Sequence, residues 1–181
     1  MSHLVLISGS PSTSSRSIAV LEYARQVLAA EKLEATIVSV RDFPPEDLIL
    51  AKYDSPAFDA VKKLIAGASG LIVSTPVYKA SYSGSLKTLL DILPQYALRG
   101  KTVLPIVTGG SAAHLLAIDY ALKPVLSVLG ATDLLQGVYI VDNQLSVAPD
   151  GKPILPDELR DRLHAALAQL AANVKSRVAS A

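Results

Sequence analysis

The sequence predicts an α/β fold in three layers, with a five-stranded parallel sheet between two layers of helices. Short apolar runs rich in β-branched residues alternate along the chain with segments whose apolar residues recur at helical spacing. The β-rich runs are apolar at consecutive positions, which indicates burial on both faces and therefore a parallel sheet covered by helices. A chain of 181 residues has the length of one domain, so we expect a single domain over residues 1–181.

The five strands are expected at residues 3–8, 35–40, 70–75, 101–108 and 132–141. Gly9 ends the first strand, and Pro76 closes the third. Connections between parallel strands are almost always right-handed, which leaves few topologies for five strands. The simplest of these is the flavodoxin-like order 2-1-3-4-5.

Five helices are expected between and after these strands, at residues 16–31, 57–68, 85–93, 111–129 and 156–178. Ser55 is a good N-cap for the second helix, with Pro56 at its first position. Gly130 ends the fourth helix. Residues 41–53 contain two consecutive prolines, Pro44 and Pro45, and are expected to form a loop.

The fourth helix contains an internal proline, Pro124. Proline removes a backbone hydrogen bond and clashes with the carbonyl group four residues earlier, here that of Tyr120, at a cost of about 3 kcal/mol in an ordinary helix. A wide π-turn would relieve the clash, and such turns often mark functional sites. We therefore expect the segment from Tyr120 to Pro124 to depart from α-helical geometry; the alternative is a simple kink with a packed tyrosine.

Ligands of such sheets bind beyond the carboxyl ends of the strands, where the strand order reverses. Three loops rich in Gly, Ser and Thr are expected to meet there: residues 9–15, 76–84 and 109–113. The first reads SGSPSTSSRS over residues 8–17, with six hydroxyl side chains after Gly9, one cation at Arg16 and no carboxylate. Together with the N-terminus of the following helix, this composition indicates a site for a terminal phosphate. The alternative is a hydroxyl-rich turn that only caps a helix.

The second and third loops have the composition of a ring-binding site. Tyr78 and Tyr82 can contact a planar ring, and Lys79 can meet an anionic cosubstrate. Gly109 and Gly110 allow the backbone to approach a ligand closely, so that the polar edge of an isoalloxazine ring would find N–H donors there. The alternative is a surface loop with packed tyrosines, followed by an unusual strand–helix turn.

The composition excludes several classes of function. The formal net charge is +1 and no dense Lys/Arg run occurs, so nothing favours nucleic acid. No Cys is present, which excludes disulfides, Cys-ligated metals and thiol catalysis, and no His/carboxylate grouping indicates a metal site. No apolar run is long enough to span a membrane and no secretory signal is evident, so we expect a cytoplasmic protein.

Three segments, GSPSTSSRS, TPVYKASYSGSLKTLLD and TGGSAAHLLAIDYALKPVL, resemble the NAD(P)H-dependent FMN reductase family. Within it, they are most similar to the FMN reductases of two-component alkanesulfonate monooxygenase systems. The resemblance covers most of residues 3–141. It implies a flavodoxin-like fold, FMN and NADPH as ligands, and assignment of the FMN site as follows: Ser10, Ser15, Arg16 and Ser17 at the phosphate; Pro76, Val77, Tyr78 and Ser81 along the ring; and Thr108, Gly109, Gly110 and Ser111 at its polar edge.

The same resemblance implies a reaction and a partner protein. NADPH would reduce FMN, and the reduced flavin would pass to a flavin-dependent monooxygenase that desulfonates alkanesulfonates for sulfur supply. Hydride transfer between the two cofactors needs no catalytic side chain, so we name none. The resemblance also implies a homodimer or homotetramer and associates a π-turn at Tyr120 with the subunit interface and with flavin release. Arg16 and Lys79 are the two cations that could favour the 2′-phosphate of NADPH.

Three alternatives remain open at the level of the sequence. A quinone, azo or chromate reductase would keep its FMN tightly bound and turn over quinone without added flavin. A flavodoxin would carry electrons without oxidising NADPH, although flavodoxins are typically acidic and often stack Trp on their flavin, and this chain has no Trp. A scaffolding or nucleotide-sensing module would use the same pocket without turnover. NADPH oxidation, measured with and without added FMN, separates these possibilities.

Overall fold

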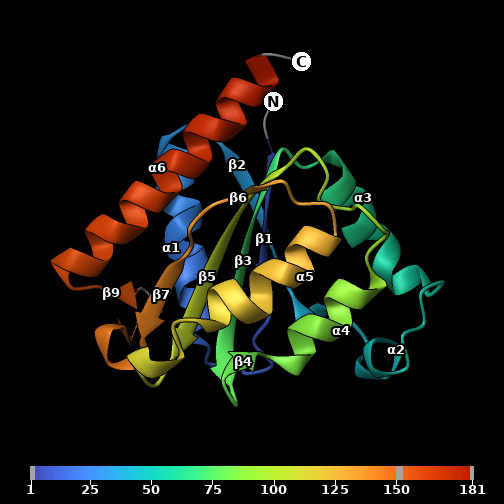
Figure 1. The fold of residues 1–181 in the computed structure, drawn as a ribbon, viewed down its shortest axis with the longest axis horizontal. Helices are drawn as coiled ribbons and strands as arrows, with labels where there is room; N and C mark the ends of the chain where they lie inside the picture. Colours follow the sequence, from blue (N-terminus) through green and yellow to red (C-terminus); the bar gives the residue numbers. More distant parts are fainter. Residues whose placement is uncertain (1–2, 150–152, 180–181) are drawn as a thin grey trace.

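The computed structural model describes residues 3–149 and 153–179, and its centre is a parallel sheet (Figure 1). The strands are β1 (His3–Ser8), β2 (Glu34–Ser39), β3 (Gly70–Tyr78) and β5 (Thr102–Gly109), followed at the edge by β6 (Asp133–Leu134) and β7 (Val138–Val141). They lie in the order β2-β1-β3-β5, with β6 and β7 both paired to β5. This confirms the predicted order 2-1-3-4-5, with β6 and β7 together in the place of the fifth strand.

Helices cover both faces of the sheet (Figure 1). Helices α1 (Arg16–Ala30) and α6 (Asp157–Ala179) pack on one face through a buried cluster that includes Leu21 and Leu163. Helices α3 (Asp59–Gly67), α4 (Gly84–Ile92) and α5 (Lys123–Val128) cover the other face, through a cluster that includes Leu86 and Leu126. Burial on both sides explains why the strand sequences are apolar at consecutive positions.

The fifth strand predicted within residues 132–141 is present but divided in two, because it is interrupted between β6 and β7. Pro105 of β5 lies level with the gap and has no N–H group to donate to a neighbour. Gly137 adopts a left-handed conformation there, with φ of 91°, and a Cβ atom at this position would lie 2.9 Å from the Pro105 carbonyl oxygen. A proline in the partner strand and a left-handed glycine thus divide the edge strand in two.

The prediction that Pro76 ends the third strand is also wrong, since β3 continues to Tyr78 and returns as the short β4 (Ser81–Tyr82). The Gly9 N–H donates to the Ser74 carbonyl, which shows that the backbone groups of Ser74 point toward β1. Pro76 is two residues further along β3, so its backbone groups point to the same side. Because β1 has already ended at Ser8, no ladder partner is lost at Pro76.

Two helical predictions needed correction near the second strand. Residues 41–53 are not only loop: η1 (Val40–Asp42) and the short α2 (Pro45–Ile49) lie here, and Pro45 is pre-set for a first helical position. Ser55 does act as an N-cap, but of a 3₁₀ turn, η2 (Pro56–Phe58), and α3 begins only at Asp59.

The single helix predicted over residues 111–129 is divided into η3 (Ala112–His114), a π-turn η4 (Ile118–Leu122) and α5. The Lys123 N–H reaches back five residues to the Ile118 carbonyl, so the wide turn ends directly before Pro124. The expected departure from α-helical geometry at Tyr120 is therefore confirmed.

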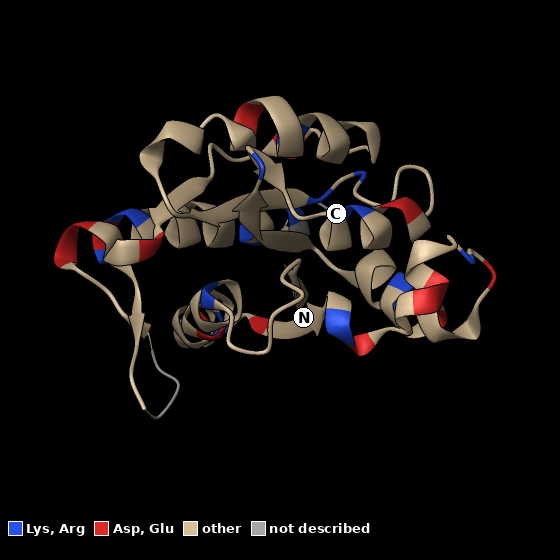
Figure 2. Cartoon of the chain, turned by 90° about the horizontal axis from the view of Figure 1, so that it is seen from below, with Lys and Arg blue, Asp and Glu red and all other residues tan. Residues whose placement is uncertain are grey.

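Basic and acidic residues are interspersed around the molecule in Figure 2, and no extended patch of one sign stands out. Within residues 3–149 and 153–179, no helix is long and apolar enough to cross a bilayer. The same described residues contain no group of three or more His, Asp or Glu side chains that could hold a metal ion.

Candidate functional site

The first two loops are joined to each other at the carboxyl ends of β1 and β3, the lower edge of the sheet in Figure 1. Gly9 N–H donates to the Ser74 carbonyl at 2.7 Å, and the buried Ser83 hydroxyl donates to the Gly9 carbonyl. Ser83 is also the N-cap of α4, accepting from Leu86 N–H at 3.0 Å. A Cβ atom on Gly9 would lie 2.6 Å from the Cβ of Leu86, so glycine is required where the loop crosses α4.

The first loop presents hydrogen-bond donors at the start of α1. Ser15 is the N-cap and accepts from Ser17 N–H at 3.1 Å, and Ser10 accepts from Ser12 N–H at 3.3 Å. Both hydroxyls therefore act as acceptors within the loop and keep their O–H groups to donate. The first turn of α1 contains no acidic residue. A 15-residue helix with an open positive end, beside hydroxyl donors, has the chemistry that a phosphate group requires.

Buried hydroxyls form a polar layer beneath this helix terminus. Ser17 and Thr108 share a hydrogen bond of 3.4 Å that ties α1 to β5, and both side chains are buried. Ser8 and Ser74, opposite each other in the β1–β3 ladder, have buried hydroxyl oxygens without a protein partner. Polar groups of this kind are usually satisfied by water or ligand, which supports a polar occupant at this end of the sheet.

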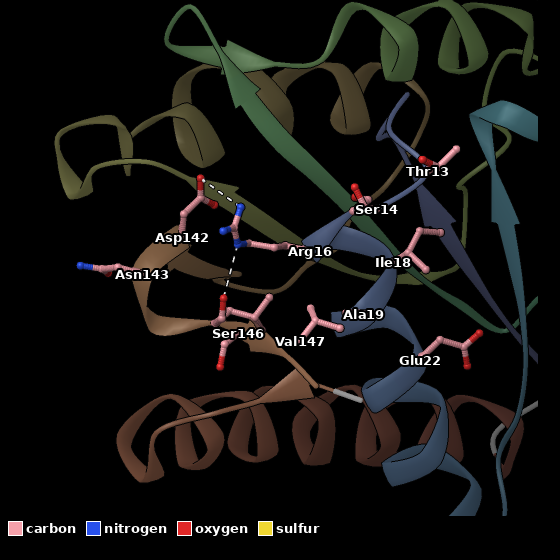
Figure 3. A pocket seen from close by; sticks show the side chains of 12 residues that line it. Thr13, Ser14, Arg16, Ile18, Ala19, Glu22, Asp142, Asn143, Ser146 and Val147 are labelled. Atoms are coloured by element: carbon pink, nitrogen blue, oxygen red, sulfur yellow. Dashed lines mark hydrogen bonds and ion pairs between the residues drawn. The ribbon is translucent and has the colours of Figure 1, made fainter. Parts of the chain in front are cut away.

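Arg16 has a different environment from the other residues of the first loop (Figure 3). Its Nε donates to the Leu145 carbonyl at 3.3 Å, and its guanidinium lies 3.9 Å from the Asp142 carboxylate. These contacts join the start of α1 to the segment that leads into the hairpin of β8 (Ser146–Val147) and β9 (Pro153–Ile154). A cavity of about 810 Å³ lies between them, lined by Thr13, Ser14, Ser15, Arg16, Ile18, Ala19, Glu22, Asp142, Asn143, Leu145, Ser146 and Val147.

The second loop is a tight hairpin between β3 and β4. Thr75 holds its base: its hydroxyl accepts from Ser83 N–H at 3.0 Å and donates to the Pro76 carbonyl at 3.0 Å. The two residues at the tip, Lys79 and Ala80, both have positive φ, 48° and 64°. Val77 and Ser81 are half-buried and Tyr78 is exposed.

The third loop is fixed by a residue that the sequence analysis did not identify. Tyr139 of β7 donates its hydroxyl hydrogen to the Ser111 carbonyl at 2.7 Å. A Cβ atom on Gly109 would collide with this hydroxyl, whereas Gly110 is open and exposed. Together, the second and third loops enclose a cavity of about 550 Å³, lined by Val77, Lys79, Ala80, Gly110, Ser111 and His114.

Tyr120 lies on the π-turn, with 79% of its surface exposed. Leu115, Leu116 and Val128, from the same stretch of chain, are also large exposed apolar residues. Exposed apolar side chains commonly take part in association with another protein surface when they form a contiguous patch.

Sequence reasoning missed Ser83 and Tyr139 as supports of the site. Ser83 carries a recognisable signal, because a serine that begins S-G-S-L ahead of an apolar helix is a natural N-cap. Nothing local marks Tyr139, since its contact with Ser111 joins residues 28 positions apart.

A doubly wound parallel sheet, with three loops rich in Gly, Ser and Thr beyond the carboxyl ends of its strands, defines an α/β protein of flavodoxin-like fold. The chain belongs to the NADPH-dependent FMN reductase family, whose profile matches residues 2–146. These are oxidoreductases that act on FMN with NADPH as electron donor.

Known relatives agree with this assignment. The chain is 56% identical to an FMN reductase (NADPH) of Pseudomonas putida over 91% of this chain and 84% of the relative. It is 50% identical to the FMN reductase (NADPH) of Escherichia coli K12, over 91% and 85%. Among solved structures, the apo form of an NADH:FMN oxidoreductase, EMOB, matches with a TM-score of 0.85 and 38% identity, over 95% of this chain and 89% of that one.

Proposed function

We propose that this protein uses NADPH to reduce FMN that it binds at the three loops, and that it releases the reduced flavin. The observation that carries the proposal is the open N-terminus of α1, with its donating hydroxyls and no acidic residue in the first turn, beside two backbone-exposed loops. FMN supplies the hydride-accepting ring when bound. The protein's part is to hold the two cofactors in contact and exclude water.

We assign the FMN phosphate to the first loop, at Ser10, Ser15, Arg16 and Ser17. For Arg16, the backbone N–H at the helix start supports this role better than the side chain, which binds Leu145. Ser17 supports the site from below, since its N–H donates to Ser15 and its hydroxyl shares a hydrogen bond with Thr108. The ring lies along Pro76, Val77, Tyr78 and Ser81. Its polar edge faces Thr108, Gly109, Gly110 and Ser111; the buried Thr108 side chain supports the loop from below.

We further propose that the reduced flavin serves a flavin-dependent alkanesulfonate monooxygenase. The sequence resemblance to reductases of such systems supports this role.

The proposed location is the cytoplasm, where NADPH is available. The protein is also proposed to form homodimers or homotetramers through exposed apolar residues near Tyr120: Leu115, Leu116 and Val128.

NADPH oxidation by the purified protein, with and without added FMN, tests the reductase activity. We expect little turnover without FMN and saturable turnover with it. Turnover of a quinone by yellow protein without free flavin would instead identify a reductase that retains its FMN. No NADPH oxidation under either condition would reject enzymatic reduction altogether. Sulfite release from an alkanesulfonate, after an alkanesulfonate monooxygenase is added, tests the partner.

A further inference from the structure

The cavity between the second and third loops is basic in character. It measures about 550 Å³, and its two ionisable lining residues are Lys79 and His114; no carboxylate lines it. Val77, Gly110 and Ser111, which also line it, belong to the proposed ring site. An anionic group that enters beside the flavin ring would therefore meet a cation without a competing acid.

Lys79 has no partner of its own. In the part of the chain that the structure describes, its ammonium group makes no hydrogen bond or ion pair. Asp119, on the π-turn that contacts β4, is paired with Lys123 at 2.6 Å. The other cation considered for phosphate recognition, Arg16, has partners of its own, the Leu145 carbonyl and the Asp142 carboxylate (Figure 3).

The turn that carries Lys79 is strained. Lys79 and Ala80 form a two-residue hairpin turn in which both φ angles are positive, a geometry that favours Asn-Gly or Gly-Gly. Neither lysine nor alanine is a residue type that this turn prefers. Turn propensity therefore does not explain why a lysine occupies position 79. Backbone strain of this kind concentrates at ligand-binding positions.

We propose that Lys79, assisted by His114, binds a phosphate group of the pyridine dinucleotide that donates hydride. This inference rests on the proposed function and deepens it by naming residues for the second substrate. The FMN phosphate is already provided for by the first loop, whereas NADPH brings a pyrophosphate and a 2′-phosphate that need a cation. A lysine ammonium is a suitable point charge for either.

The test compares Lys79→Gln and Lys79→Arg with the unmodified protein. Initial rates are measured at saturating FMN while NADPH or NADH is varied. We expect Lys79→Gln to raise the KM for NADPH roughly tenfold, the effect of one lost charged hydrogen bond, with kcat little changed. Lys79→Arg should retain most of the affinity, and His114→Gln should cause a smaller rise. Lys63→Gln, which removes an exposed lysine on α3, controls for the loss of one positive charge.

A binding measurement keeps the result independent of turnover. Calorimetric titration of the same proteins with 2′,5′-ADP and with ADP-ribose reports on the two phosphate groups separately. Weaker binding of 2′,5′-ADP at unchanged binding of ADP-ribose, with a KM change for NADPH alone, assigns Lys79 to the 2′-phosphate. Weaker binding of ADP-ribose, with equal KM changes for NADPH and NADH, assigns it to the pyrophosphate.

The inference is overturned if Lys79→Gln leaves both KM values and both binding constants unchanged, or if the KM for FMN rises instead. Either result would leave the proposed function intact, because the unmodified protein would still reduce FMN. Absence of NADPH-dependent FMN reduction in the unmodified protein would reject the proposed function itself.

Discussion

The hydroxyl of Tyr139 on β7 donates a hydrogen bond of 2.7 Å to the carbonyl oxygen of Ser111 in the third loop. Burial, with the nearby Asp142 carboxylate, raises the pKa of Tyr139 above its ordinary value. The phenol therefore remains protonated, and able to donate, throughout the neutral range. The edge strand of the sheet thereby fixes the loop that is proposed to face the polar edge of FMN.

Replacing Tyr139 with Phe removes the hydroxyl that holds the third loop but keeps the aromatic ring of residue 139, so the loop should loosen without a cavity being formed. We expect the KM for FMN to rise about fivefold, equivalent to about 1 kcal/mol for one neutral hydrogen bond. The melting temperature should fall by only a few degrees, at roughly 2–4 °C per kcal/mol. Steady-state kinetics and thermal unfolding check both values; an unchanged KM for FMN would mean that the loop does not need this anchor.

The two adjacent glycines of the third loop should respond differently to Ala. In Gly109→Ala, the new methyl group meets the Tyr139 hydroxyl, so we expect a destabilisation of about 1–3 kcal/mol, typical of overpacking. In Gly110→Ala, the methyl group meets nothing within 4 Å, and stability should be nearly unchanged. Chemical denaturation of both variants checks this contrast. Equal stabilities would show that the Tyr139 side chain moves aside at little cost.

Ser83 should be the most sensitive serine in the second loop. Ser83→Ala removes the N-cap of α4 and leaves the Gly9 carbonyl without its donor, so we expect a loss of about 2 kcal/mol. Since Ser83 also joins the first two loops, FMN affinity should fall as well. Ser85→Ala, in the first turn of the same helix, is the matched control and should change neither property.

The stability of the opposite end of the sheet should depend on pH through Asp133. Burial alone would raise the pKa of Asp133, but hydrogen bonds from Thr102, Asn173 and Arg177 together hold it below its ordinary value. Its stabilising contribution is therefore complete above the unfolded pKa, about 3.9, and is lost as the pH falls through the folded value.

Asp133→Asn should accordingly destabilise the protein by about 1–3 kcal/mol at neutral pH, and this difference should shrink below about pH 4. Denaturant unfolding of both proteins across this range provides the measurement. Glu34→Gln, on the exposed start of β2, is a control in which no such difference is expected. A difference that stays constant from neutral to acid pH would rule out the titration of Asp133 as its cause.

Tyr120→Ala should affect assembly and flavin release while leaving the fold intact. The side chain is 79% exposed on the π-turn, so its removal creates no cavity in the core. We expect weaker self-association by light scattering and a changed content of retained FMN, at an unchanged melting temperature of the dissociated chain. If association, flavin content and turnover are all unchanged, Tyr120 has no role in this surface.

The strands and their order could be predicted because the pattern that specifies them is local. Consecutive apolar residues such as Leu4 to Ile7 require burial on both faces, and the handedness of the connections then restricts the topology. The π-turn could be predicted for a similar reason, since Pro124 forbids an ordinary helix whatever packs around it. The position of the three loops followed from the topology.

The details that could not be predicted depend on residues far apart in the sequence. The break in the edge strand depends on Pro105 in the neighbouring strand, level with Gly137. The hydrogen bond from Arg16 to the Leu145 carbonyl, 129 positions away, could not be predicted either. Such pairings are decided by tertiary packing, which leaves no mark on the residue types next to either partner.

The interrupted edge strand also limits how copies of this protein can meet. A long, flat edge with free backbone groups would accept a strand from another molecule and start a growing aggregate. Here, β6 offers two residues and β7 four, and the left-handed Gly137 stands between them. The edge formed by β6 and β7 is therefore a poor template for a strand from another molecule, whereas β2, at the other edge, is continuous over six residues.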